Sequence, residues 1–188
     1  MTGEGDWLMV VDLQPAFSHP GSPWFTPALA EAAQRIKTLV PLFGSRVLFT
    51  RFVPPRTVSG SWRRYYEKWP FALDPASDWL WAVDAPWAGR PSIASHTFCK
   101  WLPEAHDRFA PDAAVVLCGV STDCCVLATA LAAVDAGADV RVVADACAAR
   151  TEAAHAGALG IMAARAPQLR IATTAEERAR HAGRTKAG

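Results

Sequence analysis

Three side chains that can carry out covalent or proton-transfer chemistry follow apolar runs typical of buried strands. Asp12 closes the run WLMVVD, Lys100 follows SIASHTFC, and Cys125 comes shortly after AAVVLC. Ligands in layered α/β sheets bind beyond the carboxyl ends of the strands, so the three side chains can meet at one edge. A thiol with a nearby carboxylate and ammonium is a nucleophile with a base and a stabilising cation. Taken singly, the aspartate could equally be a helix cap or part of a buried ion pair, and the lysine a solvated side chain.

Cys125 has the most informative surroundings of the three. Gly119 allows a sharp turn, the residues after it are helix N-cap types, and an apolar stretch follows. The positive end of a helix lowers a thiol pKa, and the unpaired N–H groups of the first turn can hold an oxyanion. A cysteine in an apolar helix is more often a small core residue, and that is our interpretation of the other isolated cysteines, Cys99, Cys118 and Cys147.

The bulk properties exclude several classes of function. With 188 residues and a formal net charge of +1, the chain is expected to form one domain with no electrostatic preference for nucleic acid or an anionic membrane. We find no membrane-spanning run, no secretion signal and no GxSxG, GxGxxG or Walker A sequence. The odd number of cysteines favours free thiols in a reducing compartment, so we expect a cytoplasmic protein.

Short apolar runs alternate with alanine-rich stretches of helical spacing. This rhythm predicts βαβ units, and therefore a single domain (1–188) with three α/β/α layers around a mostly parallel sheet of about six strands. The strands are expected at 7–12, 46–51, 92–98, 113–118, 139–144 and 169–172, and the main helices at 28–43, 124–137 and 151–166.

Residues 52–90 interrupt this regularity and are expected to form loops and short helices. Five of the eight tryptophans lie between Trp62 and Trp87, which is typical of a lid over a site or of an interface. Trp62 and Trp69 could form walls of a pocket, with Arg63 or Arg64 binding a carboxylate, or the same segment could contact another subunit. At the other end of the chain we expect a flexible tail over 182–188.

Three segments resemble the signature segments of the isochorismatase-like cysteine hydrolases. They are VVDLQPAF, the lysine in FCKW, and the stretch GVSTDCCVLATALAAVDAGADVRVVADACAA with its Thr129 and Ala130. That family includes nicotinamidases, N-carbamoylsarcosine amidases, ureidoacrylate and biuret-type amidohydrolases, and isochorismatase. The resemblance implies a Rossmann-like, isochorismatase-like hydrolase fold, a catalytic triad of Asp12, Lys100 and Cys125, a small-molecule substrate, and a homo-oligomer (dimer or tetramer).

The resemblance also implies finer features of the site. The peptide bond between Val120 and Ser121 would be cis and would help to aim backbone N–H groups at an oxyanion, while Gln14 and Phe17 would line the substrate pocket. Nicotinamidases carry an Asp-x-His metal motif after the second strand, but the corresponding stretch TRFVPPR has neither residue. We therefore expect no metal and no cofactor.

The expected activity is hydrolysis of the C–N bond of a small linear amide or ureido (carbamoyl) compound through a thioester on the cysteine. Two alternatives stay open, since a family member can be an inactive binding or scaffold protein, and isochorismatase itself cleaves a vinyl ether. A redox role for the adjacent Cys124–Cys125 pair is disfavoured because neighbouring cysteines form a disulfide only with strained geometry.

Overall fold

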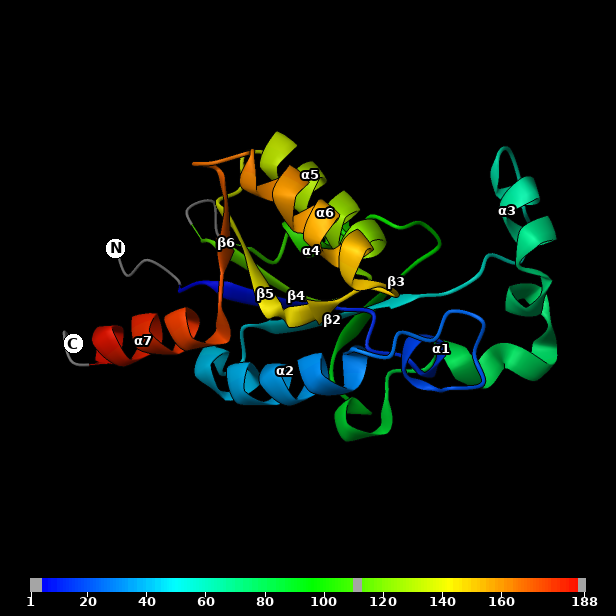
Figure 1. Cartoon of the computed structure of the whole chain (residues 1–188), viewed down its shortest axis with the longest axis horizontal. Coiled ribbons are helices and arrows are strands. Elements are labelled where there is room, and N and C mark those ends of the chain that lie inside the picture. The colour runs from blue at the N-terminus through cyan, green and yellow to red at the C-terminus, as the bar shows by residue number, and fades with distance from the viewer. Residues whose placement is uncertain (1–4, 110–112, 186–188) are drawn as a thin grey trace.

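The computed structural model describes residues 5–109 and 113–185, and its centre is a six-stranded sheet (Figure 1). The sheet has the order β3-β2-β1-β4-β5-β6, and every neighbouring pair is parallel. This confirms the predicted α/β class with a parallel central sheet. The strands are β1 (Trp7–Val11), β2 (Val47–Phe52), β3 (Ser92–Ser95), β4 (Val115–Val120), β5 (Val140–Ala148) and β6 (Leu169–Ala172).

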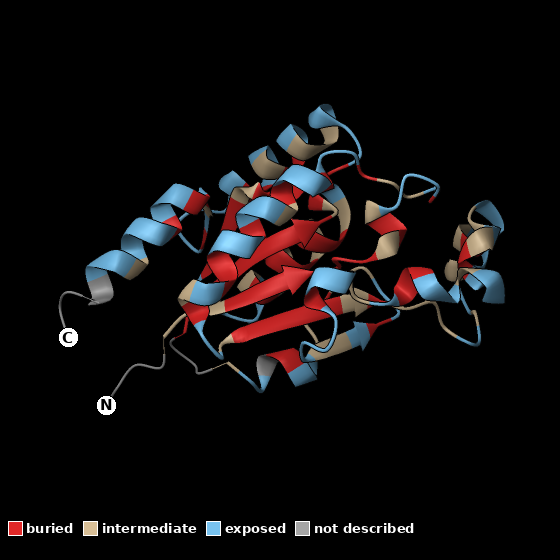
Figure 2. Ribbon diagram, turned by 90° about the horizontal axis from the view of Figure 1, so that it is seen from below, coloured by how far each residue is buried: buried red, intermediate tan, exposed pale blue. Residues whose placement is uncertain are grey.

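Helices cover both faces of the sheet and form the outer layers. Figure 1 shows α2 (Leu29–Phe43) and α7 (Thr174–Thr185) on one face, and α5 (Leu127–Asp135) and α6 (Glu152–Ala163) on the other. The four inner strands are almost entirely buried, whereas the edge strands β3 and β6 are partly exposed (Figure 2). Because both faces are covered, the central strands have continuous apolar runs rather than alternating ones. Of the helices in the described ranges, none has the length and apolar character that crossing a bilayer requires.

Several boundaries differ from the sequence predictions, and the strand expected at 92–98 ends at Ser95. The strand expected at 139–144 continues to Ala148, because the pairing of β4 and β5 shifts register between Leu117 and Gly119 and then resumes. The chain over 182–185, which we expected to be part of a flexible tail, is the last turn of α7, while 186–188 lie outside the described residues. Thr173 and Glu176 form reciprocal hydrogen bonds that cap the start of α7, a feature we did not recognise in the charged C-terminal stretch.

The segment 52–90 folds over the carboxyl ends of β1 and β2. It contains α3 (Trp62–Lys68) and three short 3₁₀ helices, η1 (Pro70–Leu73), η2 (Pro75–Trp81) and η3 (Ala85–Trp87), each of which has proline in its first turn. The two remaining short helices are α1 (Pro15–Ser18) and α4 (Pro103–His106). Several rings of the segment pack around Trp24, whereas Leu73 and Trp79 remain 43% and 52% exposed.

Gly119 sets the close approach of β4 to the end of β1. It has a φ of 113°, and a Cβ atom there would collide with the backbone of Val11, so no other residue fits without moving one of the strands. This contact brings the turn after β4 directly beside the residue that follows Val11.

A buried ionic cluster joins α7 to the sheet and gives a test of the fold. Arg141 of β5 contacts Glu177 at 2.6 Å and Asp6 at 2.6 Å, and the Glu177 side chain is fully buried. We predict that Glu177→Gln lowers the free energy of unfolding by about 3 kcal/mol, because it leaves a buried guanidinium under-compensated. Asp139→Asn, which breaks the exposed pair with Arg170, is the matched control and should cost less than about 1 kcal/mol in the same urea titration. Equal losses of unfolding free energy in the two variants would contradict the conclusion that the buried ionic cluster holds α7 against the sheet.

Candidate active site

Asp12 is held at the carboxyl end of β1 by the neighbouring strand. Its backbone has a φ of 52°, in the left-handed region that aspartate tolerates better than most side chains. Thr50 of β2 accepts a hydrogen bond from the Asp12 N–H at 3.3 Å and donates its hydroxyl to Asp12 Oδ1 at 2.8 Å. The carboxylate is therefore fixed in one orientation, with Oδ2 directed to its other neighbours.

Lys100 forms an ion pair with this carboxylate in the protein interior. The Lys100 Nζ atom lies 3.1 Å from Asp12 Oδ2, and both side chains are 0% exposed. Nζ also donates to the carbonyl oxygen of Thr97 at 2.8 Å and lies 5.1 Å from the centre of the Phe52 ring. Two buried charges persist only when they are paired and hydrogen-bonded in this way, so each holds the other in place.

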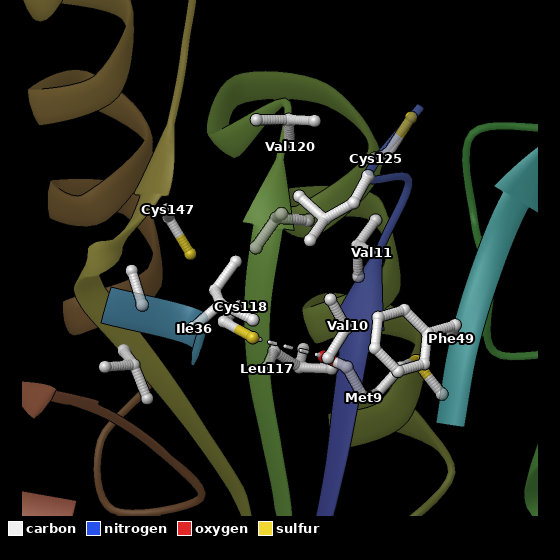
Figure 3. Close-up of a cluster of buried hydrophobic side chains, with 14 of the residues drawn as sticks. Met9, Val10, Val11, Ile36, Phe49, Leu117, Cys118, Val120, Cys125 and Cys147 are labelled. Atoms are coloured by element: carbon white, nitrogen blue, oxygen red, sulfur yellow. Dashed lines mark hydrogen bonds between the residues drawn. The ribbon is translucent and has the colours of Figure 1, made fainter. Parts of the chain in front are cut away.

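Cys125 completes the cluster from the turn that follows β4. It lies in the five-residue π-helix Thr122–Val126 that precedes α5, and its thiol is near enough to the Asp12 carboxyl group to lower the pKa of that group. Figure 3 shows Cys125 at the edge of the apolar cluster that surrounds Cys118, close to Val11 at the end of β1. The structure thus brings together the three side chains that the sequence singled out.

The protonation of this cluster differs from our expectation of a lowered thiol pKa. A hydrogen bond with the Cys124 side chain, burial and the negative charge of Asp12 raise the pKa of Cys125 well above the ordinary value, and Lys100 only partly opposes this. Burial also raises the pKa of Asp12, against the lowering effect of Lys100 and its hydrogen bonds. The resting nucleophile is therefore a thiol beside a carboxylate, and its attack requires the carboxylate as a base.

One buried hydroxyl connects the lysine segment to the nucleophile. Thr129 of α5 accepts a hydrogen bond from the Lys100 backbone N–H at 2.9 Å and donates to the Cys125 carbonyl oxygen at 2.6 Å. Thr129 is completely buried. We had noted this residue only as part of the resemblance, and its role in placing the two segments becomes visible in the structure.

The turn before the cysteine is held by its own hydrogen bonds. The peptide bond between Val120 and Ser121 is cis, and the Ser121 carbonyl oxygen accepts from the N–H groups of Cys124 (3.0 Å) and Val126 (3.1 Å). On the other side of the turn, the Thr122 hydroxyl and His155 Nδ1 are 2.9 Å apart.

A cavity of about 230 Å³ opens in front of Cys125. Ser121, Asp123, Cys124 and Cys125 form its reactive end, and Arg150 also lines it. Its apolar walls are aromatic side chains from four parts of the chain, namely Phe17, Trp24, Phe52, Tyr65, Trp69 and Phe98.

Two of the predicted lining residues lie elsewhere. Gln14 is completely buried, and its side-chain amide binds backbone groups of Phe52 and Trp81, so it joins β2 to η2 instead of contacting a ligand. Trp62 packs against Phe52 and Phe98 and is absent from the cavity lining. Phe17 and Trp69 do line the cavity, as expected from the sequence.

Trp24 and Arg150 line the cavity although the sequence pattern did not indicate them. Trp24 lies in an irregular loop whose sequence gives no periodic signal. Arg150 lies two residues after the end of β5, and the strand-end rule would have indicated it if that end had been placed at Ala148. Arg63 and Arg64, which we had considered as carboxylate ligands, are exposed and do not line the cavity.

No group of three or more His, Cys, Asp and Glu side chains suited to hold a metal ion occurs within residues 5–109 and 113–185.

Comparison with known proteins identifies related sequences and folds. The isochorismatase domain model matches residues 6–177. Isochorismatase domain-containing protein 2 of Xenopus laevis is 37% identical over 83 residues, which are 41% of this chain and 40% of that protein, so the alignment spans less than half of either.

Among solved structures, a cysteine hydrolase from Pseudomonas syringae pv. phaseolicola has a TM-score of 0.78 at 19% identity, covering 96% of this chain and 93% of that one. The nicotinamidase of Staphylococcus aureus has a TM-score of 0.62 at 18% identity, covering 92% and 100%. At these low sequence identities, the structural similarity shows that this chain has the same fold as the two proteins.

The raised thiol pKa leads to a prediction on cysteine reactivity. In Asp12→Asn the negative charge beside Cys125 is removed while Lys100 remains, so the pKa of Cys125 should fall and its alkylation by iodoacetamide should begin at lower pH than in the wild type. Mass spectrometry of each cysteine peptide against pH measures this. Asp74→Asn, at an exposed carboxylate outside the cavity, is the control and should leave the profile unchanged. A Cys125 profile that moves to higher pH in Asp12→Asn would contradict the arrangement.

The Thr129 bridge can be tested with two substitutions of similar size. Thr129→Val removes both hydrogen bonds, and we expect unfolding stability to fall by about 1–3 kcal/mol and kcat/KM to fall at least tenfold, because Lys100 and Cys125 lose their common anchor. Thr129→Ser keeps the hydroxyl and should retain most of the activity. If both variants behave alike, the hydroxyl is not what positions the two segments.

Proposed function

The chain belongs to the isochorismatase domain family, and we propose that it is a cysteine hydrolase that cleaves a small amide or ureido compound through a thioester on Cys125. The observation that supports this most strongly is the fully buried Asp12–Lys100 ion pair at 3.1 Å, with the Cys125 thiol close enough to both charges for each to affect its pKa. A nucleophile, a base and a cation placed in this way are the components of acyl transfer.

In the first step the Cys125 sulfur forms a bond to the substrate carbonyl carbon, and the thiol proton passes to Asp12. The negative charge that develops on the carbonyl oxygen is stabilised by backbone N–H groups of Ser121 and Cys125, and Lys100 balances the charge at Asp12. The carbon–nitrogen bond then breaks, and Asp12 returns the proton to the departing amine. A thioester remains on the cysteine.

In the second step water cleaves the thioester. Asp12 removes a proton from the water as its oxygen attacks the thioester carbon, and the carbon–sulfur bond then breaks. The proton on Asp12 returns to the sulfur, which restores the thiol and the carboxylate, and the acid is released. No residue changes its oxidation state, and water is the only co-reactant.

We predict that Cys125→Ala abolishes turnover of a responsive amide or ureide and that Asp12→Asn reduces kcat at least 100-fold, because it removes the base for both steps. Cys124→Ala is the matched comparison and should retain turnover, because this neighbouring thiol lines the same cavity but the proposed bond to the substrate forms at the Cys125 sulfur. The measurement is release of ammonia or amine by each purified variant. Full activity in Cys125→Ala would overturn the mechanism, and a wild-type protein that turns over no member of a broad amide and ureide panel would favour a binding role.

A further inference from the structure

A second cavity lies between the end of β2 and the short helices η1 and η2. Its volume is about 590 Å³, within the roughly 300–1,000 Å³ that is typical of pockets for small molecules. It shares no lining residue with the cavity in front of Cys125. Successive side chains of an extended chain point to opposite sides, so Phe52 lines the first cavity while Arg51 and Val53 line the second. The two cavities are therefore distinct sites on either side of the end of β2.

Arg51 is the partly buried cation of the second cavity. Its Nη1 atom donates to the Trp81 carbonyl oxygen at 3.3 Å, and the same oxygen accepts from the Gln14 side-chain amide at 2.9 Å. The Nε atom of Arg51 is buried and has no hydrogen-bond partner among the described residues. Within residues 5–109 and 113–185, no carboxylate forms an ion pair with this guanidinium. A guanidinium with unused donors in partly buried surroundings is stabilised by an anion that accepts from them.

The other lining residues indicate which anion the second cavity suits. Arg56 and Asp78 also line it and are exposed, so two guanidinium groups and one carboxylate leave a single positive charge. That charge matches a singly charged anion. Most of the remaining lining is apolar and consists of Val53, Pro54, Pro55, Val58, Leu73 and Trp81. Apolar walls beside a planar cation favour a carboxylate that is attached to an apolar body.

We propose that the second cavity binds a small organic carboxylate with an apolar body, and that Arg51 forms the hydrogen-bonded ion pair with it. Hydrogen bonds from one guanidinium to one carboxylate are charge-assisted and directional, so Arg51 fixes where the anion lies. None of the lining side chains is a thiol or a hydroxyl, so this site binds its ligand without covalent chemistry. The inference goes beyond the proposed function of Cys125 and does not depend on it.

Trp81 places the carboxylate site next to the Cys125 cavity. It lines the second cavity, and its ring centre lies 5.5 Å from that of Trp24 and 6.2 Å from that of Phe52, which both line the first cavity. One aromatic layer therefore separates the two sites. A ligand of the second cavity contacts this layer from the side opposite to Cys125.

The test measures binding by isothermal titration calorimetry with benzoate as the probe. Acetate lacks the apolar body and benzyl alcohol lacks the charge, and we expect benzoate to bind about tenfold or more tightly than either. Arg51→Gln should weaken benzoate binding about tenfold or more, because it removes the ion pair with the carboxylate. Arg63→Gln, at an exposed arginine outside both cavities, is the matched control and should leave the affinity unchanged.

A second variant keeps the test valid if Arg51→Gln unfolds through loss of its bond to Trp81. Leu73 lines the second cavity and is 43% exposed, so Leu73→Asp adds a negative charge there while Arg51 stays in place. We expect this variant to keep the thermal unfolding temperature of the wild type and to lose benzoate binding. Wild-type affinity in a folded Leu73→Asp protein would overturn the proposal.

Three further outcomes would also overturn it. Benzoate binding that is lost in Arg150→Gln and retained in Arg51→Gln would place the anion in the Cys125 cavity. Equal affinities for benzoate and benzyl alcohol would show that no cation takes part. A second copy of the chain on this surface would appear in light scattering as a mass that falls in Arg51→Gln, with no benzoate binding to the wild type. Each result leaves the test of hydrolysis by Cys125 unaffected.

Discussion

The buried ion pair between Asp12 and Lys100 is the constraint on which the rest of the site depends. Two fully buried charged side chains are tolerated only when they form an ion pair with each other and also hydrogen-bond to further polar groups. Thr50 and the Thr97 carbonyl oxygen supply those further bonds. The end of β1, the strand β2 and the segment after β3 therefore have to occupy fixed relative positions, and the parallel sheet provides them.

The Cys124 side chain, burial and the carboxylate of this pair act together on the protonation of Cys125. A helix start alone would favour a thiolate, but here the cysteine is buried, hydrogen-bonded to Cys124 and next to a carboxylate, and these effects raise its pKa. The proton therefore stays on sulfur until a substrate carbonyl is available. This arrangement limits unwanted oxidation or alkylation of the thiol, because the thiolate is the reactive form.

Much of the fold was predictable because its strands are short apolar runs at regular intervals. Asp12 at the end of β1 and the turn with Cys125 followed from that pattern together with the family resemblance, whereas Lys100 lies five residues beyond the end of β3 and was identified by the resemblance. Tertiary contacts, in contrast, leave no local signal. The burial of Gln14 against backbone groups and the inclusion of Trp24 in the cavity wall depend on how the segment 52–90 folds back.

Arg150 shows how a small boundary error affects the prediction of a site. Extension of β5 to Ala148 places the strand end two residues before Arg150, and the extension follows a register shift between Leu117 and Gly119 that periodicity does not encode. The glycine itself is needed where β4 approaches Val11. The glycine sets how closely β4 approaches β1, and the register shift is followed by the longer β5.

The most direct measurement for the central claim is detection of the covalent intermediate. A responsive amide is mixed with the wild-type protein, quenched in acid within milliseconds to seconds, and analysed by intact-mass and peptide mass spectrometry. The account predicts an acyl increment on Cys125 that appears and decays at rates matching turnover, with none on Cys124. Turnover without any acylated cysteine, or acylation confined to Cys124, would contradict it.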